Sequence, residues 1–161
     1  MLRISKLTDY GTLILTQLPV AGRGLASAGQ VSTATRLAQP TVSKLLKAMV
    51  RAGLVVSTRG ASGGYALARP ARDISAAQII DALEGPVAIT ECSSASGTCS
   101  LESICGVGHA WQKINVGIRR ALADISLADL QHHTDPLPNI PDLLGAVRGP
   151  VCRVAGSERA R

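Results

Sequence analysis

The stretch between residues 40 and 69 constrains the fold most, because it places an amphipathic helix directly before a short hairpin. Apolar side chains recur there at the i, i+3, i+4, i+7, i+8 spacing of one helical face; they are Val42, Leu45, Leu46, Met49 and Val50. The opposite face carries hydroxyl and basic groups, namely Thr41, Ser43, Lys44, Lys47 and Arg51. Two β-prone runs, residues 54–59 and 65–69, then flank a glycine-rich turn, which predicts a β-hairpin.

A second, shorter helix is predicted just before this one. Ser27 and Gln30 have the spacing of a capping box, which opens a helix that continues to about Ala34. After a turn at residues 35–38, Pro40 suits the first position of the next helix, and Gly53 ends it. Two helices joined by a tight turn, the second with a basic outer face, are typical of a helix-turn-helix. We therefore interpret the hairpin as the wing of a winged helix, with Arg59 at its tip.

The remaining chain is predicted to add helices and a tail. Residues 7–18 form a first helix with its N-terminus near Thr8 or Asp9, and the Ser75 capping-box spacing opens another. Residues 107–125 form a long helix whose apolar seam suits packing against a second copy of the chain; the seam is Trp111, Ile114, Ile118, Leu122 and Ile125. We therefore expect a mainly α protein with a small β-hairpin wing, divided into a winged helix-turn-helix domain (1–86), a cysteine-rich loop (87–106), a dimerisation helix region (107–131) and a disordered tail (132–161).

Charge is distributed very unevenly along the chain. Residues 1–72 contain ten lysines and arginines and only one acid, Asp9, whereas residues 73–161 contain seven basic and ten acidic residues, so the net +6 combines +9 with −3. A basic half that is otherwise well patterned indicates a polyanionic partner, most simply double-stranded DNA, with a solvated basic face as the alternative.

Three of the four cysteines, Cys92, Cys99 and Cys105, lie within fourteen positions and are followed by His109. In a cytosolic chain such a cluster suggests metal or redox chemistry before structural disulfides. Spacings of six and five residues are longer than those of typical zinc knuckles, so we favour an iron–sulfur cluster. A zinc site, a thiol switch and no role at all remain alternatives. Cys152 has no partner at ligand spacing and is interpreted as a bystander.

Several function classes are not supported. There is no nucleophile elbow, P-loop, dinucleotide fingerprint or paired-carboxylate motif, so we expect neither an enzyme nor a small-molecule substrate. No apolar run reaches the length of a membrane span and the first residues lack a signal-peptide pattern, so we expect no membrane partner and a cytoplasmic location. The alternative to a DNA-binding protein is a carrier protein of iron–sulfur cluster biogenesis, whose basic half would bind an acidic partner protein.

Taken together, several segments resemble the Rrf-type winged-helix transcription regulators, the group of IscR, NsrR and RirA. The matching segments are LRISKLTDYG (2–11), PTVSKLL (40–46), GLV (53–55), RGASGGY (59–65), LEGP (83–86), the three-cysteine loop and SLADL (126–130). Within the group, the chain looks most similar to the regulators of iron–sulfur assembly (SUF) operons. The resemblance covers residues 1 to about 131.

This resemblance implies a homodimeric repressor of iron–sulfur assembly genes that reads a palindromic operator. Thr41, Ser43 and Lys44 would face major-groove bases, Arg59 would enter the minor groove, and Pro40, Lys47 and Gly60 complete the expected DNA-binding set. Cys92, Cys99 and Cys105 would hold a cluster, [2Fe–2S] in preference to [4Fe–4S], with His109 or the partner subunit's Asp9 as fourth ligand. A nitric-oxide-sensing, redox-sensing or zinc-stabilised regulator of other genes is the alternative.

Overall fold

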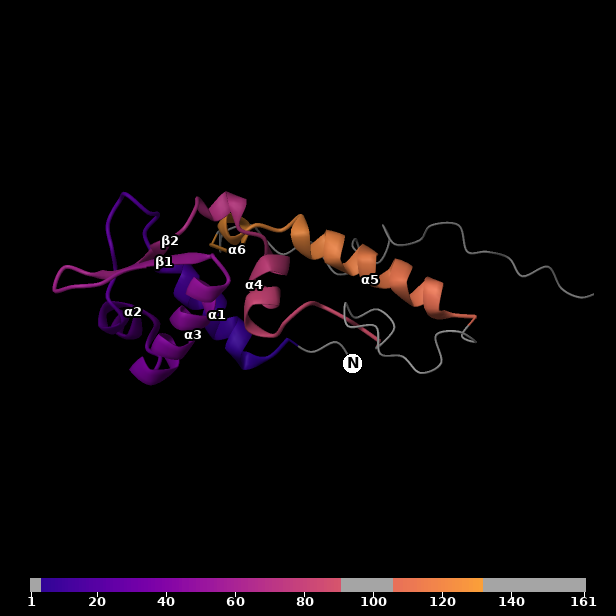
Figure 1. The fold of residues 1–161 in the computed structure, drawn as a ribbon, viewed down its shortest axis with the longest axis horizontal. Coiled ribbons are helices and arrows are strands. Elements are labelled where there is room, and N and C mark those ends of the chain that lie inside the picture. The colour runs from indigo at the N-terminus through magenta and orange to yellow at the C-terminus, as the bar shows by residue number, and fades with distance from the viewer. Residues whose placement is uncertain (1–3, 91–105, 132–161) are drawn as a thin grey trace, which may run out of the picture. The chain divides into compact units, whose positions relative to one another are not determined.

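Six α-helices, one short 3₁₀ helix and a two-stranded hairpin make up residues 4–90 and 106–131, the part of the chain described by the computed structural model (Figure 1). In chain order they are α1 (Lys6–Thr16), α2 (Ala28–Thr35), α3 (Gln39–Arg51), β1 (Val55–Thr58), β2 (Gly64–Leu67), η1 (Ala71–Asp73), α4 (Ala76–Leu83), α5 (Gly108–Ala123) and α6 (Leu127–Gln131). The prediction of a mainly α protein with a β-hairpin wing is confirmed. Residues 91–105 and 132–161, which include all four cysteines, lie outside the described residues.

Serine side chains cap the starts of α1, α2 and α4, with one correction to the predicted caps. The Ser27–Gln30 capping box forms as predicted, with the Ser27 amide donating to Gln30 Oε1 at 2.8 Å. For α1, the predicted start at Leu7 is one residue late and the capping residue is Ser5, not Thr8 or Asp9: Ser5 accepts a hydrogen bond from the Leu7 amide. Thr8 instead lies within α1, and its side chain is buried.

The end of α3 is set by a glycine, as the sequence predicts. Gly53 has φ +71°, a left-handed conformation that costs glycine little. Its amide donates to the Val50 carbonyl, and the Leu54 amide donates to the Met49 carbonyl at 3.0 Å. This pair of bonds is the Schellman arrangement, which satisfies the last carbonyls of a helix.

The hairpin is fastened to the helical body along the outer edge of β2. The Leu67 amide donates to the Pro19 carbonyl at 2.7 Å, and Tyr65 and Ala26 exchange two backbone hydrogen bonds of 2.9 Å. A Cβ added to Gly64 would lie 2.9 Å from the Ala26 carbonyl oxygen, so this close approach requires glycine. The covered edge fixes the wing beside α2 and α3.

One hydrophobic core holds these elements together. It draws aliphatic side chains from α1, α2, α3, the hairpin and α4; its fully buried members include Ile14, Leu15, Val31, Val42, Leu46, Met49, Leu67 and Ile79. Leu127 of α6 is also fully buried in it. The winged-helix core therefore includes a side chain from beyond α5, although the domain division at residue 86 stays a prediction.

Candidate nucleic-acid interface

The outward face of α3 carries the polar residues that the sequence singled out. Burial of Val42, Leu45, Leu46 and Met49 fixes the rotation of the helix. Outward-facing Lys44 and Lys47 are exposed. Pro40 is exposed as well, whereas Thr41 and Ser43 are half-buried. Pro40 occupies the second position of the helix and not the first, because α3 begins at Gln39.

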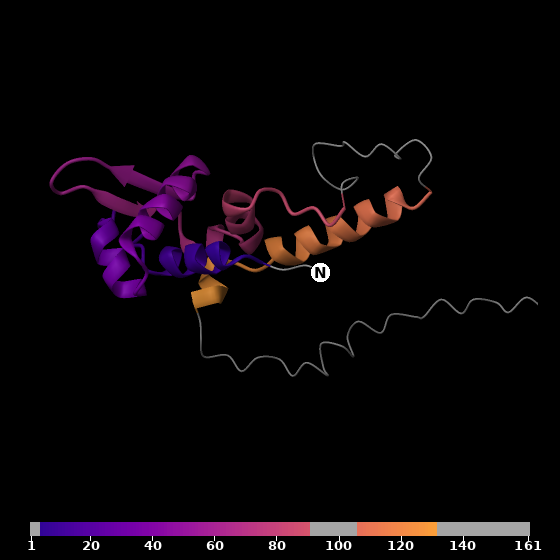
Figure 2. The same cartoon turned by 90° about the horizontal axis from the view of Figure 1, so that it is seen from below.

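The loop between β1 and β2 contributes the second set of predicted residues. Arg59 and Gly60 are both exposed there, and the loop projects beyond the helices in both views (Figures 1 and 2). Gly60 has φ +113° and its carbonyl accepts a hydrogen bond from the Gly63 amide at 2.9 Å. The turn is therefore internally hydrogen-bonded, which leaves the Arg59 side chain exposed at its start.

A groove of about 570 Å³ separates the C-terminal half of α3 from the hairpin. It brings together Lys47 and Arg51 of α3 with Arg59 of the hairpin. Its other polar lining comes from the hydroxyl-bearing residues Ser27, Ser57, Thr58 and Tyr65, and no acidic side chain lines it. Three cations and four hydroxyl-bearing residues around a groove form a surface that suits phosphate oxygens.

The groove unites three of the predicted DNA-binding residues, Lys47, Arg59 and Gly60, whereas Pro40, Thr41, Ser43 and Lys44 do not line it. Sequence reasoning missed Ser27, Ser57, Thr58 and Tyr65 as lining residues. Alternation along β1 puts Ser57 and Thr58 on different faces, so their shared place at the groove is decided by the packing of the hairpin beside α3.

The candidate cluster ligands are only partly described. Cys92, Cys99 and Cys105 lie outside the described residues. Asp9, on α1, and His109, in the first turn of α5, are both exposed. Among the described residues, no three His, Cys, Asp or Glu side chains gather into a metal-binding group.

Glu84, which sequence reasoning did not identify, ties the end of α4 to the start of α1. Its Oε1 accepts hydrogen bonds from the Ser5 amide, at 2.9 Å, and from the Thr8 hydroxyl. The Thr8 hydroxyl is the main cause that lowers the pKa of Glu84, with the Ser5 amide second. Glu84, which precedes the cysteine loop, is therefore bound to Thr8, the neighbour of Asp9 in the sequence.

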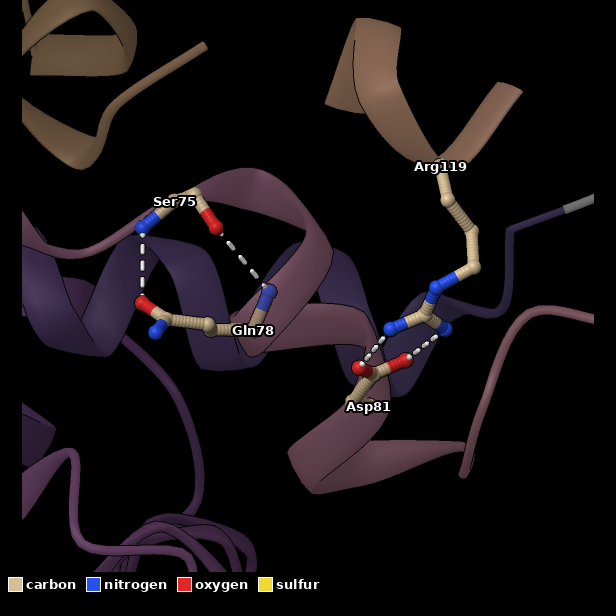
Figure 3. A network of polar contacts seen from close by, with 4 residues as sticks. All are labelled: Ser75, Gln78, Asp81 and Arg119. Carbon is tan, nitrogen blue, oxygen red and sulfur yellow. Dashed lines mark hydrogen bonds and ion pairs between the residues drawn. The ribbon is translucent and has the colours of Figure 1, made fainter. Parts of the chain in front are cut away.

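A bidentate ion pair joins α4 to α5 (Figure 3). Arg119 Nη1 and Nη2 donate to the two carboxylate oxygens of Asp81 at 3.0 and 2.7 Å. Hydrogen bonding and charge from Asp81 raise the pKa of Arg119. The planar guanidinium fits the carboxylate with both bonds at once, which restrains the direction of α5 as well as its distance from α4.

Much of α5 remains uncovered. Its predicted seam is exposed at Trp111 (39%) and Ile114 (46%), and at Ile125 (44%), which lies beyond the end of the helix. Ile118 and Leu122 of the same seam are half-buried beside α4. Large apolar side chains on one helical face are unusual at a free surface and suit burial against another helix.

Comparisons with known proteins agree with this arrangement. A family model described as Rrf2, an iron-dependent transcriptional regulator, matches residues 4–133. Protein aau3 of Rhizobium meliloti (strain 1021) is 30% identical over 145 residues, covering 89% of this chain and 92% of that protein. The HTH-type transcriptional regulator IscR of Cereibacter sphaeroides is 28% identical over 152 residues, covering 91% of this chain and 98% of that protein.

Two solved structures extend the likeness to three dimensions. CymR of B. subtilis, described as a global cysteine regulator, has a TM-score of 0.62 and 30% identity over 84% of this chain and all of that one (100%). T. potens IscR has a TM-score of 0.54 and 30% identity over 92% of this chain and 93% of that one. Within residues 4–90 and 106–131, no helix is long and apolar enough to cross a membrane.

Proposed function

Because the chain belongs to the Rrf2 family of iron-dependent transcriptional regulators, we propose that it is a homodimeric repressor whose operator binding reports iron–sulfur cluster supply. It is a DNA-binding regulator and not an enzyme. Its expected targets are cluster-assembly genes and its place of action is the cytoplasm. The observation that carries the DNA-binding proposal is the basic groove between α3 and the hairpin.

Each subunit would place α3 in a major groove of double-stranded DNA. Thr41, Ser43 and Lys44 then face the base edges, with Pro40 at the entering end of the helix. The backbone phosphates would run along the groove, where Lys47 and Arg51 line one wall. Arg59 and Gly60, at the hairpin loop, reach the adjacent minor groove.

Two such subunits would pair through α5. Burial of Trp111, Ile114 and Ile125 against a second copy removes exposed apolar surface from water, which favours association. A two-fold symmetric dimer reads a palindrome whose half-sites are about 34 Å apart, so the angle between α5 and the winged domain sets the fit to DNA.

The chain's donor set fits an iron–sulfur cluster. Three thiolates, Cys92, Cys99 and Cys105, with one nitrogen or oxygen ligand, supply four ligand positions, and we favour [2Fe–2S] over [4Fe–4S]. For the fourth position, both His109 and the partner subunit's Asp9 are exposed residues of suitable chemistry. When bound, the cluster would have one nitrogen or oxygen ligand, which holds iron less strongly than a thiolate does. Oxidants or iron shortage can therefore remove iron from it.

The signal would pass through the two ends of the cysteine loop. Glu84 holds the outgoing chain against α1, and the Asp81–Arg119 ion pair holds α5 against α4. The protein with a bound cluster and the protein without one would favour different directions of α5. Operator affinity then depends on cluster occupancy through the separation of the two α3 helices.

The deciding experiment measures iron, sulfide and zinc together with the visible spectrum in full-length protein purified without oxygen, and then duplex binding with and without the cluster. We expect iron and sulfide in equal amounts, absorption that Cys99→Ala abolishes and the matched Cys152→Ala retains, and sequence-selective binding that changes on cluster removal. Stoichiometric zinc, or no metal, would reject cluster sensing, and absence of salt-sensitive duplex binding would reject DNA recognition.

A thiol-based regulator of the same fold is the second candidate. One similar solved structure is an oxidised form of CymR from Staphylococcus aureus, 28% identical with a TM-score of 0.55. In that case metal-free protein would bind DNA with an affinity that changes on oxidation of the cysteines and returns on reduction.

A further inference from the structure

Arg36 adopts a backbone conformation that arginine ordinarily avoids. It follows α2 as its C-cap, with φ 57° and ψ 24°, and it is the only residue other than glycine with positive φ among the described residues. In this left-handed region the Cβ crowds the neighbouring carbonyl oxygen, whereas glycine has no Cβ to strain. A turn built for stability alone would carry glycine here.

The side chain does nothing for the fold that would offset this strain. Arg36 is exposed, and within the described residues no hydrogen bond or ion pair joins its guanidinium to another group. The turn is held by other contacts: Ser32 Oγ donates to the Leu37 carbonyl and Thr35 Oγ1 donates to the Val31 carbonyl, both at 2.7 Å. The conformation is thus set by the α2–α3 turn, whatever side chain stands at position 36.

The surroundings leave the guanidinium uncompensated. Residues 10–72 contain no Asp or Glu, so no carboxylate from α2, α3 or the hairpin neutralises it. Arg36 precedes the first residue of α3 by only three positions. A planar cation at this place lies beside the end of the helix that enters the DNA groove, where the bordering phosphates pass.

We infer that Arg36 is a DNA-binding residue that contacts a backbone phosphate, and that this contact is why a strained arginine occupies the turn. The inference rests on the proposed binding of DNA through α3. Strained backbone retained without a structural benefit is characteristic of functional positions. The contact is to phosphate and not to a base, so it contributes equally on every duplex sequence.

The test compares Arg36→Gly with Arg36→Lys in the full-length protein, using fluorescence anisotropy with a mixed-sequence 30-base-pair duplex from 50 to 200 mM salt. Loss of one phosphate contact makes the slope of log affinity against log salt about 0.9 shallower. The ratio of affinities at 50 and 200 mM should therefore fall about 3.5-fold in Arg36→Gly. Arg36→Lys, which keeps the charge, should retain the wild-type slope.

Arg72→Ala is the matched control, because it removes the same charge from an exposed position on η1; its slope should be unchanged. Thermal unfolding separates binding from folding: Arg36→Gly should melt at or above the wild-type temperature. A wild-type slope in Arg36→Gly, or a melting temperature several degrees lower, overturns the inference while leaving the proposed function intact. Wild-type protein that binds no duplex even at 50 mM salt would instead overturn the proposed function.

Discussion

Arg59 begins the exposed loop of the hairpin and lines the same groove as Lys47 and Arg51. We expect Arg59→Ala to weaken operator binding by about 1–3 kcal/mol, because an arginine that reaches into a groove contributes both charge and hydrogen bonds there. Binding curves with the operator and with a scrambled duplex of equal length measure this loss. Lys47→Ala provides the comparison, since a pure phosphate contact should weaken both duplexes alike. An Arg59→Ala variant that binds as wild type does would exclude the hairpin from the interface.

Glu84 makes the stability of the fold depend on acid. Its folded-state pKa lies below the ordinary value of 4.5, so its stabilising effect is complete above pH 4.5 and is lost as the pH falls through the lowered pKa. Glu84→Gln should therefore reduce the free energy of unfolding at pH 7, and the difference from wild type should shrink below pH 4. Urea titrations of both proteins at the two pH values test this. If the variant and the wild type differ by the same free energy of unfolding at both pH values, the hydrogen bonds to Thr8 and Ser5 do not depend on the charge of Glu84.

At the scale of elements, the Asp81–Arg119 ion pair is the polar link between α4 and α5. The two side chains retain 30% and 38% of their exposure, so water screens the pair and the expected coupling is modest. A double-mutant cycle of Asp81→Ala and Arg119→Ala should give a coupling of about 0.5–1 kcal/mol in urea unfolding. Arg120→Ala, at the exposed next position of α5, should show no coupling to Asp81→Ala. Strict additivity of the Asp81 and Arg119 changes would mean that the pair does not restrain α5.

For the whole molecule, the exposed seam of α5 predicts self-association. Ile114→Lys should dissociate the dimer, because a charge in a buried helix seam is costly to desolvate. Val116→Lys is a closely matched control: Val116 and Ile114 are both 46% exposed, but Val116 lies on the opposite side of α5. Sedimentation velocity at micromolar concentration distinguishes the two. A dimer that survives Ile114→Lys would place the subunit interface elsewhere.

Features that depend on neighbours in the sequence were predictable. The Ser27 and Ser75 capping boxes, the end of α3 at Gly53 and the apolar stripe of α3 all form as expected. Each rests on bonds or spacings within about one or two helical turns, so the local sequence contains the whole cause. The capping residue of α1 was misassigned because Thr8 also satisfies capping rules, and the burial of Thr8 depends on α4 packing beside α1.

The sequence by itself therefore determined the order of the hairpin and of helices α1 to α5, though not η1 or α6, together with the basic half of the chain and the residues on the outer face of α3. Only the tertiary structure decided that Lys47, Arg51 and Arg59 share one groove, that Glu84 binds the start of α1 and that Leu127 enters the core. These contacts join residues far apart along the chain. Their partners are chosen by how the helices pack, because burial of the shared core fixes which distant surfaces meet.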